Sequence, residues 1–124
     1  MSLEHIHLSQ KAKDQLIKLK RITGIQNWNV LCRWAFCVSL AEPSPPPDTK
    51  IPADSNVEMT WKVFGGQYSD IFFALIKERC KQDGLSLDEH TLASQFKLHL
   101  HRGISYLTAN ATIKNIAALS NLSS

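Results

Sequence analysis

The 124-residue sequence is poor in cysteine, in long apolar runs and in the glycine patterns that bind phosphate. Its three cysteines, Cys32, Cys37 and Cys80, form no C-x-x-C pair. This argues against a disulfide framework and a structural zinc site, and we expect three buried, small hydrophobic residues. No run of about 18 apolar residues occurs, so no membrane-spanning helix is predicted. The N-terminal segment lacks the apolar core of a secretory signal, and we expect a cytoplasmic protein.

Motifs of catalytic and cofactor-binding sites are also absent from the sequence. Gly65 and Gly66 are adjacent and lack the longer spacing of a phosphate-binding loop, and no G-x-S-x-G or H-E-x-x-H pattern is present. Two His-x-His pairs occur, at residues 5–7 and 99–101, but neither has a carboxylate or thiol at metal-ligand spacing. We therefore expect no metal, no cofactor and no enzymatic activity.

The net charge of +3 is small but unevenly distributed. Residues 1–24 contain five Lys or Arg and two Asp or Glu, whereas residues 25–124 contain nine of each kind. A basic cluster in an otherwise balanced chain is typical of a surface that binds the phosphate backbone of nucleic acid. A solvated helix face without a ligand is the alternative. The basic residues of this cluster are Lys11, Lys13, Lys18, Lys20 and Arg21.

The first 41 residues predict a strand, a helix, a turn and a second helix. Residues 5–9 alternate polar and apolar as in a half-exposed strand, and Ser9 is placed to cap the helix that follows. This helix covers residues 10–22, with one apolar stripe between two basic flanks, and Gly24 ends it. Asn27 is placed to cap the second helix, residues 28–41, which is apolar on nearly every side.

The second helix predicts self-association, because a chain of this length has difficulty covering an apolar helix on all sides. We expect a homo-oligomer with this helix in or beside the interface. Arg33, its only charged residue, is either paired within the fold or directed at an anion, and the cost of burying a lone charge favours pairing. The expected interface residues are Trp28, Leu31, Trp34, Ala35 and Val38.

The rest of the chain predicts an irregular connector, a strand and more helices. Four prolines between residues 43 and 47 begin the connector, residues 43–57. Residues 58–64 alternate as a strand does, and a helix over 70–83 follows, capped by Ser69. Its inner side should carry Ile71, Phe72, Leu75, Ile76 and Arg79. A capping box, Ser86 to Glu89, begins a fourth helix that ends before Gly103, and a further short helix over 113–119 is predicted.

These elements predict a mainly α fold. We expect a single compact domain over residues 1–124, with four to five helices and one or two short strands.

Three segments of the sequence resemble one protein family: IHLSQKAKDQLIKLKRITGIQNWNVLCRWAFCVSLAE, TWKVFGGQYSDIFFALIKERC and HLHRGISYLTA. They are similar to the DndE family of bacterial DNA sulphur-modification proteins over nearly the whole chain. The resemblance implies an accessory subunit of the machinery that replaces a non-bridging phosphate oxygen of DNA with sulphur. It also implies assembly as a tetramer and binding of duplex DNA, with a preference for nicked duplex.

Partners are implied by the same resemblance: a cysteine desulfurase, an ATP-using sulphur-transfer protein and a large ATPase. A nicking activity has been proposed for the family. The sequence contains no catalytic constellation to support it, so we predict a non-enzymatic protein.

Two other functions fit parts of the sequence. A strand followed by two helices is the order found in ribbon-helix-helix regulators, whose strands enter the major groove. In that case His5, His7 and Ser9 would face bases, and Arg33 is a further candidate for a DNA contact. The protein could instead be a scaffold that contacts an acidic partner and never touches DNA. Affinity that depends on DNA sequence would indicate a regulator, and affinity that depends only on salt would indicate a backbone binder.

Overall fold

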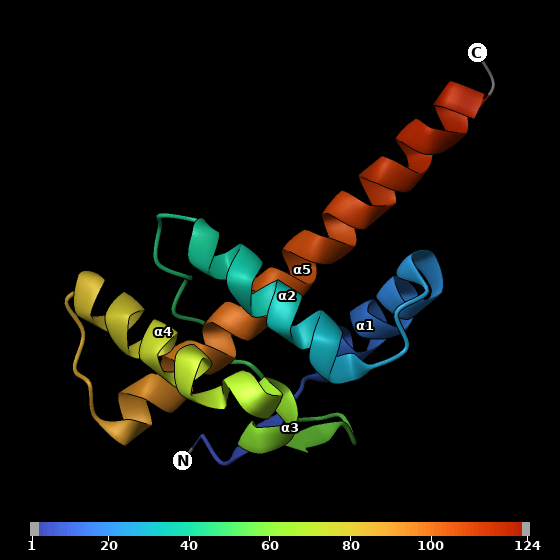
Figure 1. The fold of residues 1–124 in the computed structure, drawn as a ribbon. Helices are drawn as coiled ribbons and strands as arrows, with labels where there is room; N and C mark the ends of the chain where they lie inside the picture. Colours follow the sequence, from blue (N-terminus) through green and yellow to red (C-terminus); the bar gives the residue numbers. More distant parts are fainter. Residues whose placement is uncertain (1–2, 123–124) are drawn as a thin grey trace.

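The part of the chain that the structure describes is built from five α-helices and one small sheet. The computed structural model describes residues 3–122, and for residues 111–122 it gives the course of the helix alone. In chain order the elements are β1 (His5–His7), α1 (Gln10–Thr23), α2 (Trp28–Ala41), β2 (Glu58–Thr60), α3 (Trp61–Gly65), the 3-10 turn η1 (Gly66–Tyr68), α4 (Ser69–Gln82) and α5 (Glu89–Leu122) (Figure 1). The predicted mainly α fold, with a strand, helix, turn and helix at its N-terminus, is confirmed.

Helix α1 begins and ends as the sequence predicts. The Ser9 hydroxyl accepts a hydrogen bond from the Ala12 backbone N–H at 3.1 Å, which satisfies one of the free donors of the first turn. Gly24 has a φ of 76°, the left-handed conformation that glycine adopts at helix ends. The apolar stripe of this helix consists of Ala12, Leu16 and Leu19, and all three residues are buried.

The core lies between α2 and α5, with α1, α3 and α4 around them. Figure 1 shows α2 crossing α5, and the C-terminal half of α5 projecting away from the rest of the fold. Four phenylalanines fill the centre, with ring centroids 4.9 to 6.1 Å apart in tilted and edge-on arrangements. They are Phe36, Phe64, Phe72 and Phe96. Because they come from four different helices, they fix how those helices meet.

Helix α5 is longer than predicted. Gly103 does not end it, and the expected short helix over 113–119 is its continuation. The reason is packing: a Cβ atom at Gly103 would lie 1.7 Å from the carbonyl oxygen of Ala35 on α2. Glycine stands here to allow close approach of two backbones.

The strand predicted over 58–64 is wrong beyond its first three residues. Residues 58–60 pair antiparallel with β1, in the register His5 with Thr60, Ile6 with Met59 and His7 with Glu58. The Thr60 hydroxyl then accepts from the Val63 N–H at 3.1 Å and begins α3, so a cap overrides the alternating pattern. The intrachain pairing also counts against the ribbon-helix-helix fold, because the strand finds its partner within its own chain.

Two caps and one face of the later helices also differ from prediction. Ser69 is the first residue of α4, not its cap, and Ile71 and Leu75 are exposed. Phe72, Ile76 and Arg79 are buried as expected. At the start of α5 the capping residue is Asp88 and not Ser86: the Asp88 carboxylate accepts a hydrogen bond from the Thr91 N–H at 2.8 Å.

Residues 42–57 contain no helix or strand. They run from the C-terminal end of α2 past α5 to the N-terminal end of α1. There the Asp54 carboxylate accepts the Gln10 N–H at 2.7 Å, and the Ser55 hydroxyl donates to the Leu8 carbonyl at 2.6 Å. The segment is irregular but is bonded to the fold at both ends.

Candidate nucleic-acid interface

The basic side chains of α1 lie on different sides of the helix and have different surroundings. Lys13 donates to the Asn56 side chain at 2.6 Å, and the Lys20 ammonium lies 4.5 Å from the ring centroid of Trp28. Lys11 and Arg21 are exposed, and Lys18 is half-buried. By helical spacing Lys11 and Lys18 share the flank opposite Lys13 and Lys20. The side chains most open to a polyanion are therefore Lys11, Lys18 and Arg21.

A pocket of about 500 Å³ lies beside the first turn of α1. Its walls are the start of α1, the connector and the middle of α5. The charged residues that line it are Lys11, Lys50, Asp54 and Arg102, so positive charge is in excess. Ser9, Gln15, His101, Ser105 and Tyr106 also line it, together with prolines and aliphatic side chains of the connector.

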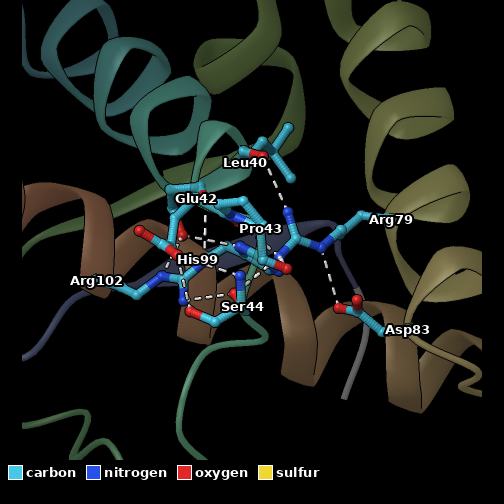
Figure 2. Close-up of polar contacts among 9 residues, drawn as sticks. Leu40, Glu42, Pro43, Ser44, Arg79, Asp83, His99 and Arg102 are labelled. Atoms are coloured by element: carbon cyan, nitrogen blue, oxygen red, sulfur yellow. Dashed lines mark hydrogen bonds and ion pairs between the residues drawn. The ribbon is translucent and has the colours of Figure 1, made fainter.

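Two arginines bind the backbone at the C-terminal end of α2, and we call this pair the arginine clamp (Figure 2). Arg79, from α4, donates to the carbonyl oxygens of Leu40, Glu42, Pro43 and Ser44 at 2.8 to 3.2 Å. Its Nε is 3.0 Å from the Asp83 carboxylate. The carbonyls at a helix C-terminus have no intrahelical donor and carry the negative end of the helix dipole, so a buried cation is stabilised there.

Arg102, from α5, approaches the same segment from the opposite side (Figure 2). It donates to the Ser39 hydroxyl, the Ser39 carbonyl and the Ser44 carbonyl, each at 2.8 Å. The two guanidinium groups thus fix the first residues of the connector between α4 and α5. Because Arg102 also lines the pocket, the clamp fixes one of the pocket's walls.

Four of the histidines, His5, His7, His99 and His101, form hydrogen bonds or ion pairs within the chain. His5 pairs with Glu58 across the sheet at 3.1 Å, and both side chains are exposed. The His7 Nε2 is 2.6 Å from the Ser55 carbonyl oxygen. Ser9 is buried, with its hydroxyl on Ala12 and its N–H on the His101 ring at 3.2 Å. The Ser9 hydroxyl is therefore engaged in capping α1 and is not exposed for the predicted DNA contact.

Burial controls the protonation of two histidines on α5. His99 is fully buried against Ser39 at 2.8 Å, and burial, followed by the charges of Arg79 and Arg102, lowers its pKa to about 4. Burial also lowers the pKa of His101, partly opposed by its hydrogen bond to the Lys97 carbonyl. Both rings are therefore neutral at pH 7, and neither adds positive charge to the surface.

Only some of the interface residues predicted on α2 lie on its outer face. Leu31 and Ala35 have no exposed surface and pack in the core of their own chain, so they cannot contact a second copy. Trp28 is half-buried beneath Lys20. Trp34 is 53% exposed, and Val38 is half-buried. The stripe that faces outward at helical spacing consists of Val30, Trp34, Cys37, Val38 and Ala41.

Arg33 lies beside this stripe. It is unpaired in the described part of the chain, whereas the sequence favoured a partner within the fold. Among residues 3–110, whose side chains the structure describes, no hydrogen bond or ion pair to Arg33 is found, and its Nε is buried without a partner. A guanidinium in this state stabilises an anion or a carbonyl brought to it by another molecule.

All three cysteine thiols have raised pKa values. Burial raises the pKa of Cys32 to about 12 and also raises the pKa of Cys80, and the partial desolvation of its thiol raises the pKa of Cys37. Cys37 is exposed, contrary to the expectation that all three are buried. In the part of the chain that the structure describes, no three His, Cys, Asp or Glu side chains are placed to bind a metal ion. None of the helices described there is long and apolar enough to cross a membrane.

The family model for the DNA sulphur modification protein DndE matches residues 5–115. The chain belongs to the DndE family. Among solved structures it is similar to DndE from Escherichia coli B7A, which is involved in DNA phosphorothioation modification. The two are 26% identical with a TM-score of 0.70, over 86% of this chain and 98% of that one. A crystallised DndE mutant gives 20% identity and a TM-score of 0.63, over 86% and 99%, and so shows the shared fold. Comparison with curated proteins gives no significant match.

The roles of the connector and the arginine clamp in this DndE family protein are not visible in the sequence. In the sequence Lys50 belongs to an irregular segment, whereas the structure places it in the same pocket as Lys11. Arg79 is predicted on the inner side of its helix, but nothing in the spacing indicates that it caps α2. The one available signal is a buried arginine on an amphipathic helix, which requires a partner.

Proposed function

We propose that this DndE family protein is an accessory, non-enzymatic subunit of the DNA phosphorothioation system that binds duplex DNA through the phosphate backbone. The observation that carries the proposal is the position of the chain's positive excess. Lys11, Lys18 and Arg21 extend along one helix without an internal ion pair among the described residues, and Lys50 adds a charge beside its first turn. Such a surface contacts phosphates without reading bases.

The basic surface of one chain is modest, and assembly would multiply it. We propose a homo-oligomer, a tetramer by the family resemblance, with the outer stripe of α2 in the interface. The support is an exposed tryptophan, two valines and an unpaired arginine on one helix face, since Trp and Arg are enriched where protein interfaces are most buried. Several linked copies bind DNA through effective concentration, although each site alone is weak.

Light scattering tests the assembly. The wild-type protein should have a mass several times that of one chain, and Trp34→Glu should shift it to the monomer because a carboxylate would be buried at the contact. Ile71→Glu is the matched control, since Ile71 is equally exposed but lies on α4, and this variant should keep the wild-type mass. A monomeric wild-type protein at micromolar concentration contradicts the proposed oligomer.

Binding to DNA is tested with intact and nicked duplexes of several unrelated sequences while salt is raised. We expect similar affinity for every sequence and a steep loss with salt, and the resemblance implies tighter binding to the nicked duplex. Affinity confined to one sequence would favour the regulator. If the protein binds no duplex at low salt, the remaining hypothesis is a scaffold whose partners are the sulphur-modification subunits.

A further inference from the structure

We propose that the pocket between α1, the connector and α5 binds one unstacked nucleotide of a DNA strand. Its phosphate would lie on Lys11 and Lys50, and its base against Tyr106 and the connector prolines. The inference rests on the proposed DNA binding and adds to it a site for a nucleotide that has left the duplex stack.

The charges of the pocket favour a phosphate. Asp54 is the only acidic residue among the described residues that line it, and that carboxylate already accepts the Gln10 N–H at 2.7 Å. Arg102 is bonded to Ser39 and Ser44 and contributes its charge from the wall. Lys11 and Lys50 are exposed, and no hydrogen bond or ion pair joins either to another described residue. Two lysines from different segments, neither bonded to another described residue, thus line the same pocket.

The shape and chemistry of the lining favour a nucleotide over a simple anion. A volume of about 500 Å³ is in the range of small-molecule sites, whereas one phosphate needs far less. Tyr106 is 38% exposed at the pocket, and the Arg102 guanidinium lies 5.8 Å from its ring centroid, which fixes the ring. Flat aromatic side chains are the usual platforms for unpaired bases, and Pro47, Ile51 and Pro52 offer further apolar surface.

Hydrogen-bonding groups are present at the edge of a bound base. Gln15 and Ser105 lie in the wall and bond to each other at 3.3 Å. An amide and a hydroxyl both donate and accept, so this pair can adapt to the polar edge of any base. The lining therefore favours a nucleotide in general, without selecting one base.

The pocket is formed before any ligand binds. The connector wall is fixed by the arginine clamp at residues 39–44 and by the bonds of Asp54 and Ser55 to the start of α1. Pro46, in the same wall, is buried. Restricting the connector in this way reduces the entropy lost when a nucleotide is bound.

Titration of the full-length, isotope-labelled protein with small probes tests the site. The probes are deoxyadenosine monophosphate, deoxyadenosine and inorganic phosphate, with amide chemical shifts as the readout. We expect shifts at residues that line the pocket, and affinity for the monophosphate at least about tenfold above that of either part alone. Equal affinity for inorganic phosphate, or shifts elsewhere in the protein, would overturn the inference.

A second experiment asks whether the nucleotide comes from a DNA strand. Affinity is compared for a fully paired duplex and for the same duplex with one unpaired nucleotide. The wild-type protein should prefer the second by about tenfold. Tyr106→Ala should abolish the preference while leaving affinity for the paired duplex within about twofold, and Tyr106→Phe should retain the preference because the ring remains.

Lysine variants complete the test. Lys50→Gln should weaken binding of the monophosphate about tenfold, whereas Lys81→Gln, at another exposed lysine on α4, should not. If the wild-type protein binds both duplexes equally, the nucleotide site is refuted and the proposed function stands. If it binds neither duplex, both fail.

Discussion

At Gly103 the backbones of α5 and α2 come closer than any residue with a side chain allows. Even one methyl group at this position would meet the Ala35 carbonyl at 1.7 Å. This close approach lets the aromatic rings of Phe36 and Phe96 pack 4.9 Å apart across the same pair of helices. A single position without a side chain therefore sets the distance between the two central helices.

Gly103→Ala should destabilise the protein. Alanine favours a helix over glycine by about 1 kcal/mol, but forcing the helices apart costs more, and we expect a net loss of about 2 to 4 kcal/mol in the free energy of unfolding. Denaturant titration measures it. The control is Ala109→Gly at an exposed position of α5, which should lower the free energy of unfolding by about 1 kcal/mol. Gly84→Ala is unsuitable as a control because Gly84 has a φ of 73°, which strains any residue with a side chain. A stabilised Gly103→Ala variant would contradict the close approach of the helices.

Stability should also fall as the pH is lowered from 6.5 to 4.5. The pKa of His99 is about 4 in the fold and about 6.5 when unfolded, so the unfolded chain binds more protons in this window. The shift of His101 has the same sign. We expect a loss of about 1 to 2 kcal/mol, measured by denaturant titration across the range. The carboxyl groups of Glu42 and Asp88, whose pKa values are lowered, lose their contribution only at lower pH. Constant stability across the window would refute the buried neutral histidine.

Among the elements, the connector differs most from the linker that its prolines suggest. It lacks helix and strand, yet Arg79 and Arg102 bond to the backbone at its start, and Asp54 and Ser55 bond to the N-terminal end of α1. A linker bound in this way acts as a wall of the fold. Its position, and not its own secondary structure, brings Lys50 to Lys11.

Arg79→Lys should make the start of the connector more mobile. Lysine keeps the charge but cannot serve four carbonyls and Asp83 at once, so buried groups would be left without partners. We expect a loss of about 2 to 4 kcal/mol in stability and faster proteolysis within residues 42–52. Lys81→Arg, on the exposed side of the same helix, should change stability by less than about 0.5 kcal/mol. Unchanged proteolysis in Arg79→Lys would show that the clamp does not fix the connector.

Elements with strong local signals are predictable from the sequence, and those decided by distant residues are not. Helix α1 agrees with prediction because Ser9 and Gly24 mark its ends and an apolar stripe gives its period. Helix α2 begins after Asn27 as predicted, but the Asn27 side chain makes no capping hydrogen bond there. Residues 61–65 alternate like a strand, but the Thr60 cap and the packing of Phe64 into the core make them helical. In the sequence, Gly103 looks like the end of a helix. Its actual role, close packing against Ala35, cannot be predicted because Ala35 is far away in the chain. For the site, the charge cluster is visible in the sequence, whereas Lys50 needs the fold to place it.

At the scale of the whole molecule, a basic helix is followed along the chain by a helix with an apolar outer stripe. Lys11, Lys18 and Arg21 run along α1, and the outer stripe of α2 follows directly after the turn at Gly24. Membership of the DndE family gives this arrangement a context in DNA sulphur modification. In the function proposed above, backbone contacts position the protein on duplex DNA.

The most direct test is the salt dependence of binding to an intact duplex. Wild-type protein is compared with a variant in which Lys11, Lys18 and Lys50 are glutamine, and with a matched control in which Lys62, Lys77 and Lys81 are glutamine. All three control lysines are exposed on α3 and α4. We expect the first variant to bind weakly and to flatten the log–log slope by about 0.9 for each phosphate that it no longer neutralises, while the control keeps the wild-type slope. An unchanged slope in the first variant, or an equal reduction in both, would contradict DNA binding through this surface.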